Sequence, residues 1–365
     1  MNLKRFFAGM AAALLAAILL SNQQVSAVSA SNAIVVDGQT GRVLYEKAPD
    51  QQVLIASTTK IMTALLICEQ CNVLDRVAIP KEAVGIEGSS MYLREGEVMT
   101  VQELLYGLML HSGNDAAAAL AIYCAGTVEN FAEMMNDKAR LLDMTNSHFV
   151  NPHGLDAPGH YSTARDMAKL AAYAMENPIF YQTVSTKAVK AAGRNLQNHN
   201  KLLWRVEGAD GVKTGFTKAS GRILVSSATR QGRRIIVVTM NDPNDWQDHA
   251  KLLEDGFSQF EVKELIARNT VLGYVEVAGG QQGQVELLAD AGFSLAVTQD
   301  EQLQIQLPAP GFVYAPVVQG QNAGYAHVLL DGAAVGKVPI VYGDTVEMTP
   351  EEKPRLLDKL RNLFT

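Results

Sequence analysis

The stretch from Ile55 to Leu66 reads I-A-S-T-T-K-I-M-T-A-L-L and places a serine and a lysine three residues apart. If this stretch is helical, Ser57 and Lys60 share one face within a turn, where the amine and the hydroxyl can hydrogen-bond. A serine becomes a strong nucleophile when a base takes its proton, and a lysine is such a base only when burial or a neighbouring cation keeps it neutral. S-x-x-K is equally typical of a helix start followed by a solvated lysine, so other motifs must decide.

A second polar motif lies further along the chain. Leu108 to Ala119 reads L-M-L-H-S-G-N-D-A-A-A-A and holds Ser112, Gly113 and Asn114 at a predicted break between two helical segments. Polar side chains at such a break can point into a cleft, although S-G-N alone is also an ordinary turn.

A third motif opens the first of a late group of predicted strands. Gly211 to Phe216 reads G-V-K-T-G-F, so Lys213 and Thr214 precede Gly215, which lets another backbone approach closely. K-T-G alone is weak evidence. The three motifs in this order, each in its expected helix, loop or strand, are the set of class A β-lactamases and penicillin-binding proteins.

The composition predicts a folded, acidic protein. Its 365 residues are 48% hydrophobic, which provides ample core for two domains of about 100 to 200 residues each. The formal net charge is −7. We therefore expect no nucleic-acid partner.

Residues 1–30 have the pattern of a secretory signal peptide. Lys4 and Arg5 precede an apolar run from Phe6 to Leu20, and two Val-Ser-Ala triplets at the end suit signal peptidase. The run is shorter than the roughly 20 residues of a membrane-spanning helix, although an uncleaved N-terminal anchor is the alternative. No cysteine closely follows the run, so a lipoprotein is not indicated. Loss of the leader would change the formal charge from −7 to −9.

The cysteines are Cys68, Cys71 and Cys124, few and odd in number for an exported protein, so no disulfide framework is predicted. Cys68 and Cys71 form a C-x-x-C motif at the end of an apolar helical run, without the preceding strand and turn of a redox site. We interpret this pair as small core residues rather than as a redox or metal site.

The first part of the chain predicts one α+β domain from residue 31 to 260. Apolar spacing of three and four predicts helices between residues 54 and 170, with capping boxes at Thr100 with Glu103 and at Thr163 with Asp166. Strands precede and follow this helical middle, and a helix at 246–260 ends the domain. The predicted strands are 33–36, 42–45, 209–216, 222–229 and 233–240.

The pattern changes after residue 260. Short valine-rich runs separated by turn residues predict a small all-β domain over 261–348, which we interpret as a spacer or interaction module. In the last segment, 349–365, the stretch P-R-L-L-D-K-L-R-N-L-F at 354–364 predicts an amphipathic helix that lies on a membrane surface or packs on its own protein. The valine-rich runs are 271–277, 303–307, 313–318 and 326–330.

The resemblance to one family extends beyond the three motifs. S-S-M-Y-L-R-E-G-E, N-P-H-G-L-D, Y-S-T-A-R-D-M-A and G-V-K-T-G-F-T resemble D-alanyl-D-alanine carboxypeptidases of the low-molecular-weight penicillin-binding protein type. The likeness covers residues 31–260 and, more loosely, the β-rich part that commonly follows. It implies an antiparallel sheet with helices on both sides, an extracytoplasmic location, peptidoglycan stem peptides as substrate and β-lactams as covalent inhibitors.

The resemblance also implies roles for individual residues. Ser57 would attack the carbonyl between two D-alanines to form an acyl-enzyme, with Lys60 as base. Lys213 would help to keep Lys60 neutral and would bind the substrate's terminal carboxylate.

Four more residues receive roles in the same way. Ser112 would relay a proton to the departing D-alanine, and Asn114 would hold the donor peptide. Thr214 would help Lys213 to bind the carboxylate, and the backbone NH groups of Ser57 and Phe216 would stabilise the oxyanion.

Two residues depart from the family pattern. Phe216 varies in the family and would act through its backbone, whereas Arg222 replaces an expected aromatic or aliphatic residue and would alter the cleft wall.

There are two rival functions. A class A β-lactamase needs a deacylating glutamate; Glu133, the candidate, is interpreted as a solvated helix residue. The other rival is a wall-binding protein without catalysis.

Three histidines, His148, His153 and His160, are the candidate metal ligands. Their spacing matches no zinc pattern, and N-P-H-G-L predicts a loop that His153 supports structurally. We therefore predict no metal and no cofactor.

Overall fold

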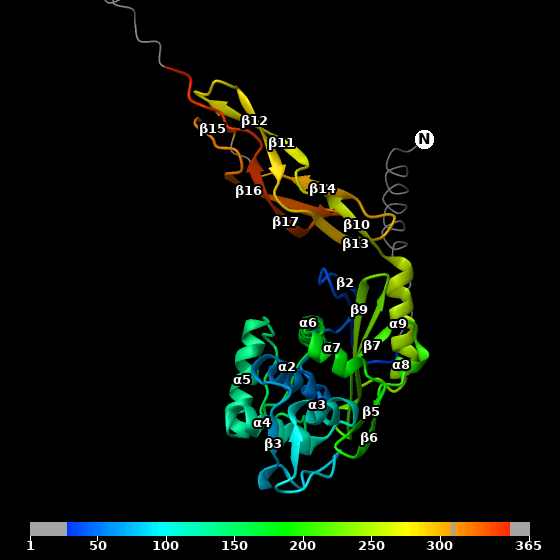
Figure 1. Ribbon diagram of the computed structural model, residues 1–365. Coiled ribbons are helices and arrows are strands. Elements are labelled where there is room, and N and C mark those ends of the chain that lie inside the picture. The colour runs from blue at the N-terminus through cyan, green and yellow to red at the C-terminus, as the bar shows by residue number, and fades with distance from the viewer. Residues whose placement is uncertain (1–27, 308–310, 351–365) are drawn as a thin grey trace, which may run out of the picture. The chain divides into compact units, whose positions relative to one another are not determined.

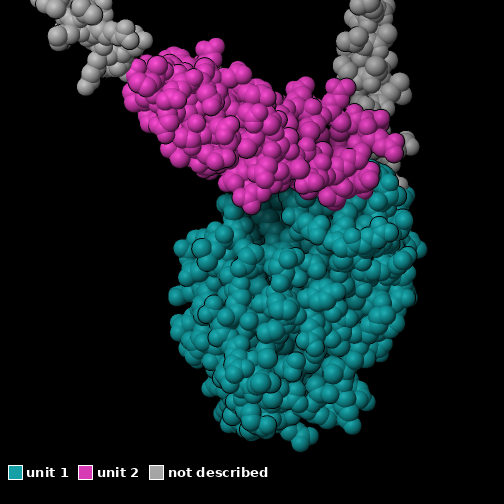
Figure 2. Space-filling model, turned by 45° about the horizontal axis from the view of Figure 1, so that its top comes forward, with its two compact units in different colours: residues 1–259 teal, residues 260–365 magenta. Residues whose placement is uncertain are grey.

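The computed structural model describes residues 28–307 and 311–350. The predicted leader up to residue 27 and the predicted terminal helix from residue 351 lie outside these ranges. The chain divides between Gln259 and Phe260 into two compact units, shown in separate colours in Figure 2. Within the described ranges no helix is both long and apolar enough to cross a membrane.

The first unit is built on a five-stranded antiparallel sheet (Figure 1). The strand order is β2-β1-β9-β8-β7, so strands from the beginning and the end of the unit pair in its middle. Runs of Ile and Val residues favour these strands, and D-G-Q-T-G forms the first turn with Gly41 at a φ of 72°. The strands are β1 (Asn32–Asp37), β2 (Val43–Lys47), β7 (Ala209–Thr217), β8 (Gly221–Arg230) and β9 (Arg233–Met240).

Each face of this sheet buries its own hydrophobic cluster, because successive side chains of a strand point to opposite sides. Ile34 and Val238 pack with the helical middle of the unit, whereas Val35 and Val237 pack with Leu252 of α9 (Asp245–Gln259). The expected antiparallel sheet with helices on both sides is confirmed.

The helical middle is less uniformly helical than the sequence pattern suggests. A hairpin of two three-residue strands, β3 (Arg76–Ala78) and β4 (Val98–Thr100), interrupts it, and two 3₁₀ turns, η1 (Ala56–Thr59) and η2 (Lys81–Ala83), add to it. Strands of three residues are too short to show a period of two. The helices are α2 (Lys60–Gln70), α3 (Val101–Leu110), α4 (Asn114–Ala125), α5 (Val128–Leu141), α6 (Ala164–Ala174) and α7 (Pro178–Ser185).

Only one of the two predicted capping boxes is complete. Thr100 accepts from the Glu103 backbone NH, and the Glu103 carboxylate accepts from Thr100 in return. Thr163 caps α6 through the Asp166 NH, but the Asp166 carboxylate instead accepts from Asn146 and Ser147. That carboxylate thus fastens the 142–147 turn to α6.

Between α7 and β7 the structure adds elements that the sequence pattern did not predict. They are the hairpin of β5 (Ala188–Ala191) with β6 (Arg194–Gln197), and the short helix α8 (Leu202–Arg205). Asn200, between the hairpin and α8, donates through its side chain to the Gly211 carbonyl at 2.7 Å and so ties this segment to β7.

The second unit is all-β, as expected. β10 (Glu261–Ile266) pairs with β13 (Phe293–Val297), and a six-stranded sheet has the order β14-β16-β17-β12-β11-β15. The sheet is antiparallel except for the parallel pair β11 and β15. Its strands are β11 (Val271–Ala278), β12 (Gln284–Ala289), β14 (Leu303–Gln306), β15 (Phe312–Tyr314), β16 (Asn322–Leu330) and β17 (Ala333–Tyr342).

Candidate active site

The S-x-x-K motif forms a 3₁₀ turn that runs directly into a helix. Ser57 lies in η1, and Lys60 begins α2. Side chains three residues apart eclipse one another in a 3₁₀ turn, and Lys60 Nζ donates to Ser57 Oγ at 3.1 Å. The expected contact is therefore present, although it arises from a 3₁₀ turn rather than from an α-helix.

Lys60 is fully buried and its amine has three acceptors. Besides Ser57 Oγ, they are Asn114 Oδ1 at 2.6 Å and the His153 carbonyl oxygen at 2.5 Å. Burial lowers the pKa of Lys60 well below its usual value, the positive charge of Lys213 lowers it further, and Asp115 opposes both. A neutral amine keeps two N–H groups for Asn114 Oδ1 and the His153 carbonyl and turns its lone pair to the Ser57 hydroxyl, which is the state that a general base requires.

Lys213 is the second buried cation of the site. It lies on β7 with 2% of its surface exposed, and its Nζ donates to the Thr214 carbonyl at 2.8 Å. Burial lowers its pKa to about 7. Its charge acts on Lys60 in the direction that the sequence motifs predict.

The S-G-N motif forms the junction between α3 and α4. Ser112 is buried and adopts a left-handed φ of 61°, which turns the chain so that Asn114 can start α4. Asn114 Nδ2 donates to the Glu87 carbonyl at 2.5 Å, so its Oδ1 faces Lys60. Over the part of the chain that the structure describes, no hydrogen bond joins Ser112 Oγ to Ser57, Lys60 or Lys213.

The K-T-G strand passes very close to the serine turn. A Cβ on Gly215 would lie 3.2 Å from the Thr58 backbone nitrogen and 3.3 Å from Ala56 Cβ. Phe216, the next residue, has 64% of its surface exposed. The bare backbone of Gly215 thus lets the edge strand β7 lie directly beside η1.

The sequence motifs did not indicate two supports of the site. The His153 carbonyl oxygen accepts a hydrogen bond from the Lys60 amine. The next residue, Gly154, has a φ of 87°, and a Cβ there would clash with the Ala56 carbonyl. Asp115 accepts from the Met91 and Leu93 backbone NH groups at 2.9 and 3.1 Å and so holds the 87–93 loop over α4. N-P-H-G-L predicted the loop that carries His153, but not that its carbonyl oxygen accepts from Lys60.

The candidate metal ligands serve as loop supports. His160 Nδ1 accepts from the Val150 NH at 3.1 Å, and its Nε2 lies 2.7 Å from Thr59 Oγ1. His153 Nδ1 accepts from the Leu155 NH, and His148 Nδ1 lies 2.6 Å from the Gly159 carbonyl. The described residues contain no group of three or more His, Cys, Asp or Glu side chains suited to a metal ion.

Arg222 does not form part of the cleft wall, contrary to the expectation from the sequence. Its neighbour Ile223 packs into the helical side of the sheet, so Arg222 points to the opposite face. There it forms two hydrogen bonds of 2.8 Å with the Asp245 carboxylate and stacks on Trp246. Glu133 is exposed on α5.

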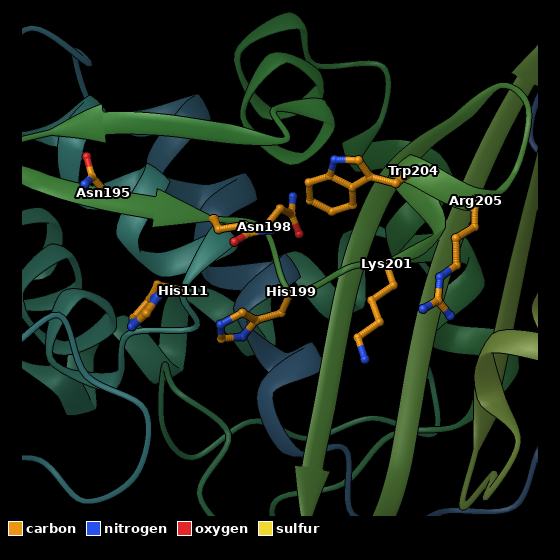
Figure 3. Close-up of a pocket in the computed structure, with 8 residues that line it drawn as sticks. His111, Asn195, Asn198, His199, Lys201, Trp204 and Arg205 are labelled. Atoms are coloured by element: carbon orange, nitrogen blue, oxygen red, sulfur yellow. The ribbon is translucent and has the colours of Figure 1, made fainter.

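A cavity of about 760 Å³ borders the S-G-N junction (Figure 3). His111, the residue before Ser112, and His199 face each other there with ring centroids 5.3 Å apart. Burial lowers the pKa of His199 to about 4, and the charge of Lys213 contributes to this shift. The cavity therefore lies close enough to Lys213 for its charge to act on His199. Its lining is His111, Asn195, Gln197, Asn198, His199, Lys201, Trp204 and Arg205.

A buried lysine on a serine, beside a K-T-G edge strand, defines a serine peptidase of the penicillin-binding class. The comparison with known families agrees, because the family model for D-alanyl-D-alanine carboxypeptidase matches residues 20–244. The model for the C-terminal domain of penicillin-binding protein 5 matches residues 260–348. The chain belongs to the D-alanyl-D-alanine carboxypeptidase family, whose members are serine-type peptidases, and the family resemblance predicted from the sequence is confirmed.

Curated relatives and solved structures extend this likeness over nearly the whole chain. The D-alanyl-D-alanine carboxypeptidase DacF of Bacillus subtilis is 33% identical, over 85% of this chain and 84% of its own length. The D-alanyl-D-alanine carboxypeptidase DacC of Escherichia coli is 34% identical, over 89% and 86%. Penicillin-binding protein 5 of Haemophilus influenzae superimposes with a TM-score of 0.77 at 30% identity, over 88% of this chain and 98% of that one.

Proposed function

We propose that this protein removes the terminal D-alanine from peptidoglycan stem pentapeptides through an acyl-enzyme on Ser57. The observation that carries this proposal is the 3.1 Å contact of Ser57 Oγ with Lys60 Nζ, a buried amine with a strongly lowered pKa. Neutral Lys60 accepts the serine proton as Ser57 Oγ bonds to the carbonyl carbon between the two D-alanines. The leaving group is the amine of the last D-alanine.

The second lysine and the neighbouring backbone complete the reaction. Lys213 and the Thr214 hydroxyl bind the terminal carboxylate, which selects a substrate that ends at this residue. The backbone NH groups of Ser57 and Phe216 stabilise the oxyanion; one such donor is typically worth about 2.7 to 4 kcal/mol of barrier. The close approach of Gly215 to Thr58 and Ala56 supports this placement.

The remaining polar residues handle the proton and the peptide. Ser112, at the α3–α4 junction, passes the proton to the departing D-alanine, and the Asn114 amide holds the donor peptide besides orienting Lys60. Water then hydrolyses the ester on Ser57. A β-lactam would acylate Ser57 in the same way and leave slowly.

The cellular role and the organisation of the chain are part of the proposal. Removing the last D-alanine leaves a tetrapeptide that no longer serves as a cross-linking donor, so the enzyme would limit cross-linking outside the cytoplasmic membrane. We propose a leader over 1–30, the peptidase domain over 31–260, the β-domain over 261–348 and a terminal helix over 349–365. Contact of residues 354–364 with a membrane surface remains a prediction, because they lie outside the described residues.

The test is to incubate the mature protein with a fluorescent penicillin and, separately, with a pentapeptide ending in D-Ala-D-Ala. We expect a covalent label and released D-alanine, with both reduced by at least about 10³-fold in Ser57→Ala because the nucleophile is lost. Circular dichroism controls for the fold of the variant.

Other outcomes would point to a different function or a different nucleophile. Rapid turnover of penicillin without D-alanine release would indicate a β-lactamase. A folded protein with neither label nor release would indicate a wall-binding protein, whereas label and release that persist in Ser57→Ala would indicate a nucleophile other than Ser57.

A further inference from the structure

The segment between Val28 and β1 is packed into the first unit by its side chains and its backbone. Val28 and Ala30 are buried in the hydrophobic cluster that Leu252 of α9 also joins. The amine of Lys47 donates to the Val28 carbonyl at 3.1 Å and to the Ala30 carbonyl at 2.6 Å. Although this segment falls within the predicted leader 1–30, its contacts are those of a structural part of the domain.

Two carboxylates meet at Ser29, between these buried residues. The Ser29 hydroxyl oxygen lies 2.6 Å from Asp242 Oδ1 and 2.9 Å from Asp248 Oδ2, and the Ser29 backbone NH donates to Asp248 Oδ2 at 2.6 Å. A hydroxyl has one proton, so it donates to only one of the two carboxylates at a time. Neither member of this carboxylate pair forms an ion pair with any residue that the structure describes.

The position of Asp242 makes its negative charge unfavourable. This residue is fully buried, and burial raises the pKa of its carboxyl. The hydrogen bond from Ser29 opposes that rise, and the negative charge of Asp248 adds to it. A positive charge beside the carboxylate pair would therefore stabilise the folded protein.

The sequence offers two bonds for removal of the leader, one after each Val-Ser-Ala triplet, because a small residue precedes both bonds. From the contacts described above we propose that the cleaved bond is Ala27–Val28, and that the α-ammonium created on Val28 is the counter-charge of the carboxylate pair. A segment that is discarded on export has no place in the folded domain, whereas the residues after Ala27 have partners there. The leader proposed above as 1–30 would accordingly end at Ala27.

The chemistry of this cleavage creates the positive charge close to the carboxylate pair. Water adds across the Ala27–Val28 bond, which leaves a carboxylate on Ala27 and, on Val28, an amine that is protonated at neutral pH. The Ser29 nitrogen lies 2.6 Å from Asp248 Oδ2. Successive backbone nitrogens are at most about 3.7 Å apart, so the ammonium lies within about 6 Å of this carboxylate, a range over which opposite charges stabilise each other.

Cleavage after Ala30 would have the opposite result. It would remove the buried Val28 side chain and the Ser29 donor, and the carboxylate pair would keep its mutual repulsion. The new ammonium would lie on Ser31, at the backbone nitrogen that donates to the Met240 carbonyl at 3.1 Å. The two cleavage sites therefore predict mature proteins of different stability.

The first experiment produces the full chain with its leader in an exporting bacterium and determines the N-terminus of the purified protein by Edman sequencing and intact mass. We expect Val-Ser-Ala-Ser. Ala27→Leu should abolish this N-terminus, because the residue before the cleaved bond must be small, whereas Ser26→Leu is the matched control one residue further away and should keep it. An N-terminus at Ser31, or equal processing of the two variants, would overturn the proposal.

The second experiment measures what the ammonium does to stability. Thermal unfolding compares three chains that share the natural C-terminus and begin at Val28, at Gln24 or at Ser31. The chain from Ser31 lacks a buried apolar side chain and should unfold about 3 to 10 °C below the chain from Val28. The chain from Gln24 keeps every residue from Val28 onward but has an amide in place of the ammonium, so it should unfold about 1 to 4 °C below the chain from Val28.

Asp248→Asn tests whether charge causes the difference between the chains from Val28 and Gln24. It should lower the unfolding midpoint of the first more than that of the second, because only the first carries the ammonium beside Asp248. Equal midpoints for these two chains, or an equal effect of Asp248→Asn on both, would overturn the pairing. These measurements involve neither Ser57 nor its substrate, so they are independent of the proposed reaction.

Discussion

The site holds two buried lysines, and their surroundings decide which of the two is neutral. Both are buried, and two neighbouring ammonium groups in a low-dielectric interior repel each other strongly. The proton leaves the lysine on which burial and the other cation act together, which is Lys60. Burial lowers the pKa of Lys213 to about 7, so the negative charge of a bound substrate carboxylate can restore the proton on this lysine.

This electrostatic arrangement predicts the pH dependence of acylation. Activity should rise with pH as Lys60 loses its proton and fall again as Lys213 loses its own, with the alkaline limb of kcat/KM near pH 7 in the free enzyme. Bound substrate adds a negative charge beside Lys213, which raises its pKa, so the alkaline limb of kcat should lie at higher pH. Steady-state profiles with the pentapeptide measure both limbs; coincident limbs would contradict the assignment.

Lys213→Arg separates the charge of this residue from its titration. A guanidinium stays protonated throughout the working range, so the alkaline limb should disappear, with a lower maximum because arginine does not reproduce the 2.8 Å contact of Nζ. The same profile measured on Lys201→Arg, a variant of an exposed lysine, serves as the control. An unchanged alkaline limb in Lys213→Arg would assign that limb to another group.

At the residue scale, the sequence indicated which side chains gather at the candidate site but not which groups contact them. Ser57, Lys60, Asn114 and Lys213 stand out because their motifs are ordered along the chain. The His153 carbonyl leaves no such trace, because every residue carries a backbone oxygen and only the fold decides where it points. Arg222 was misjudged for the same reason, since its partner Asp245 lies 23 residues away.

The contact between two elements, β7 and η1, sets the geometry of the candidate site. Gly215 is the residue through which they touch, and Thr58 and Ala56 lie opposite it. A methyl group here would contact backbone as well as side-chain atoms, so β7 and η1 would have to separate by a few tenths of an ångström. The nucleophile and the substrate-binding strand would separate with them.

Gly215→Ala should therefore reduce both catalysis and stability. We expect kcat/KM and the penicillin acylation rate to fall by about 10- to 100-fold, since small displacements at a reacting centre have effects of this order. Urea unfolding should show a loss of about 1 to 3 kcal/mol. Gly283→Ala, where a Cβ meets nothing within 4 Å, is the matched control and should change neither quantity. Equal acylation by both variants would show that the contact does not set the geometry.

At the element scale, the longer and more regular segments of the first unit were predicted correctly and the short ones were missed. β8 and β9 have eight or more residues, are buried on both faces in continuous runs, and were predicted within about two residues. The β3–β4 hairpin was missed because three residues carry no period. In the second unit, β10, β12, β13 and β17 were not predicted. β10 and β13 pair with each other across two intervening strands, whereas β12 and β17 pair with the strands that precede them, β11 and β16.

The order of the elements shows why the site exists only in the complete first unit. β1 and β9 come from opposite ends of that unit and must pair before the sheet can pack against α2–α7 on one face and α9 on the other. Ser57 and Lys60 come from the N-terminal half, and Lys213 comes from the C-terminal half. Contacts so far apart in sequence form together in a cooperative unit. Every residue of the candidate site lies before Gln259, where the chain divides.

A chain that ends at Gln259 should consequently keep its chemistry. We expect kcat/KM for a soluble pentapeptide, and the rate of penicillin labelling, to stay within about twofold of the full chain, because separate units contribute nearly independently. The same truncation carrying Ser57→Ala is the control for labelling without catalysis, and circular dichroism shows whether the shortened chain folds. A folded truncation with a much slower acylation rate would mean that the β-rich unit shapes the candidate site. A truncation that keeps its rate on the soluble peptide but loses activity on intact peptidoglycan would place the contribution of residues 260–365 in reaching the wall rather than in the reaction.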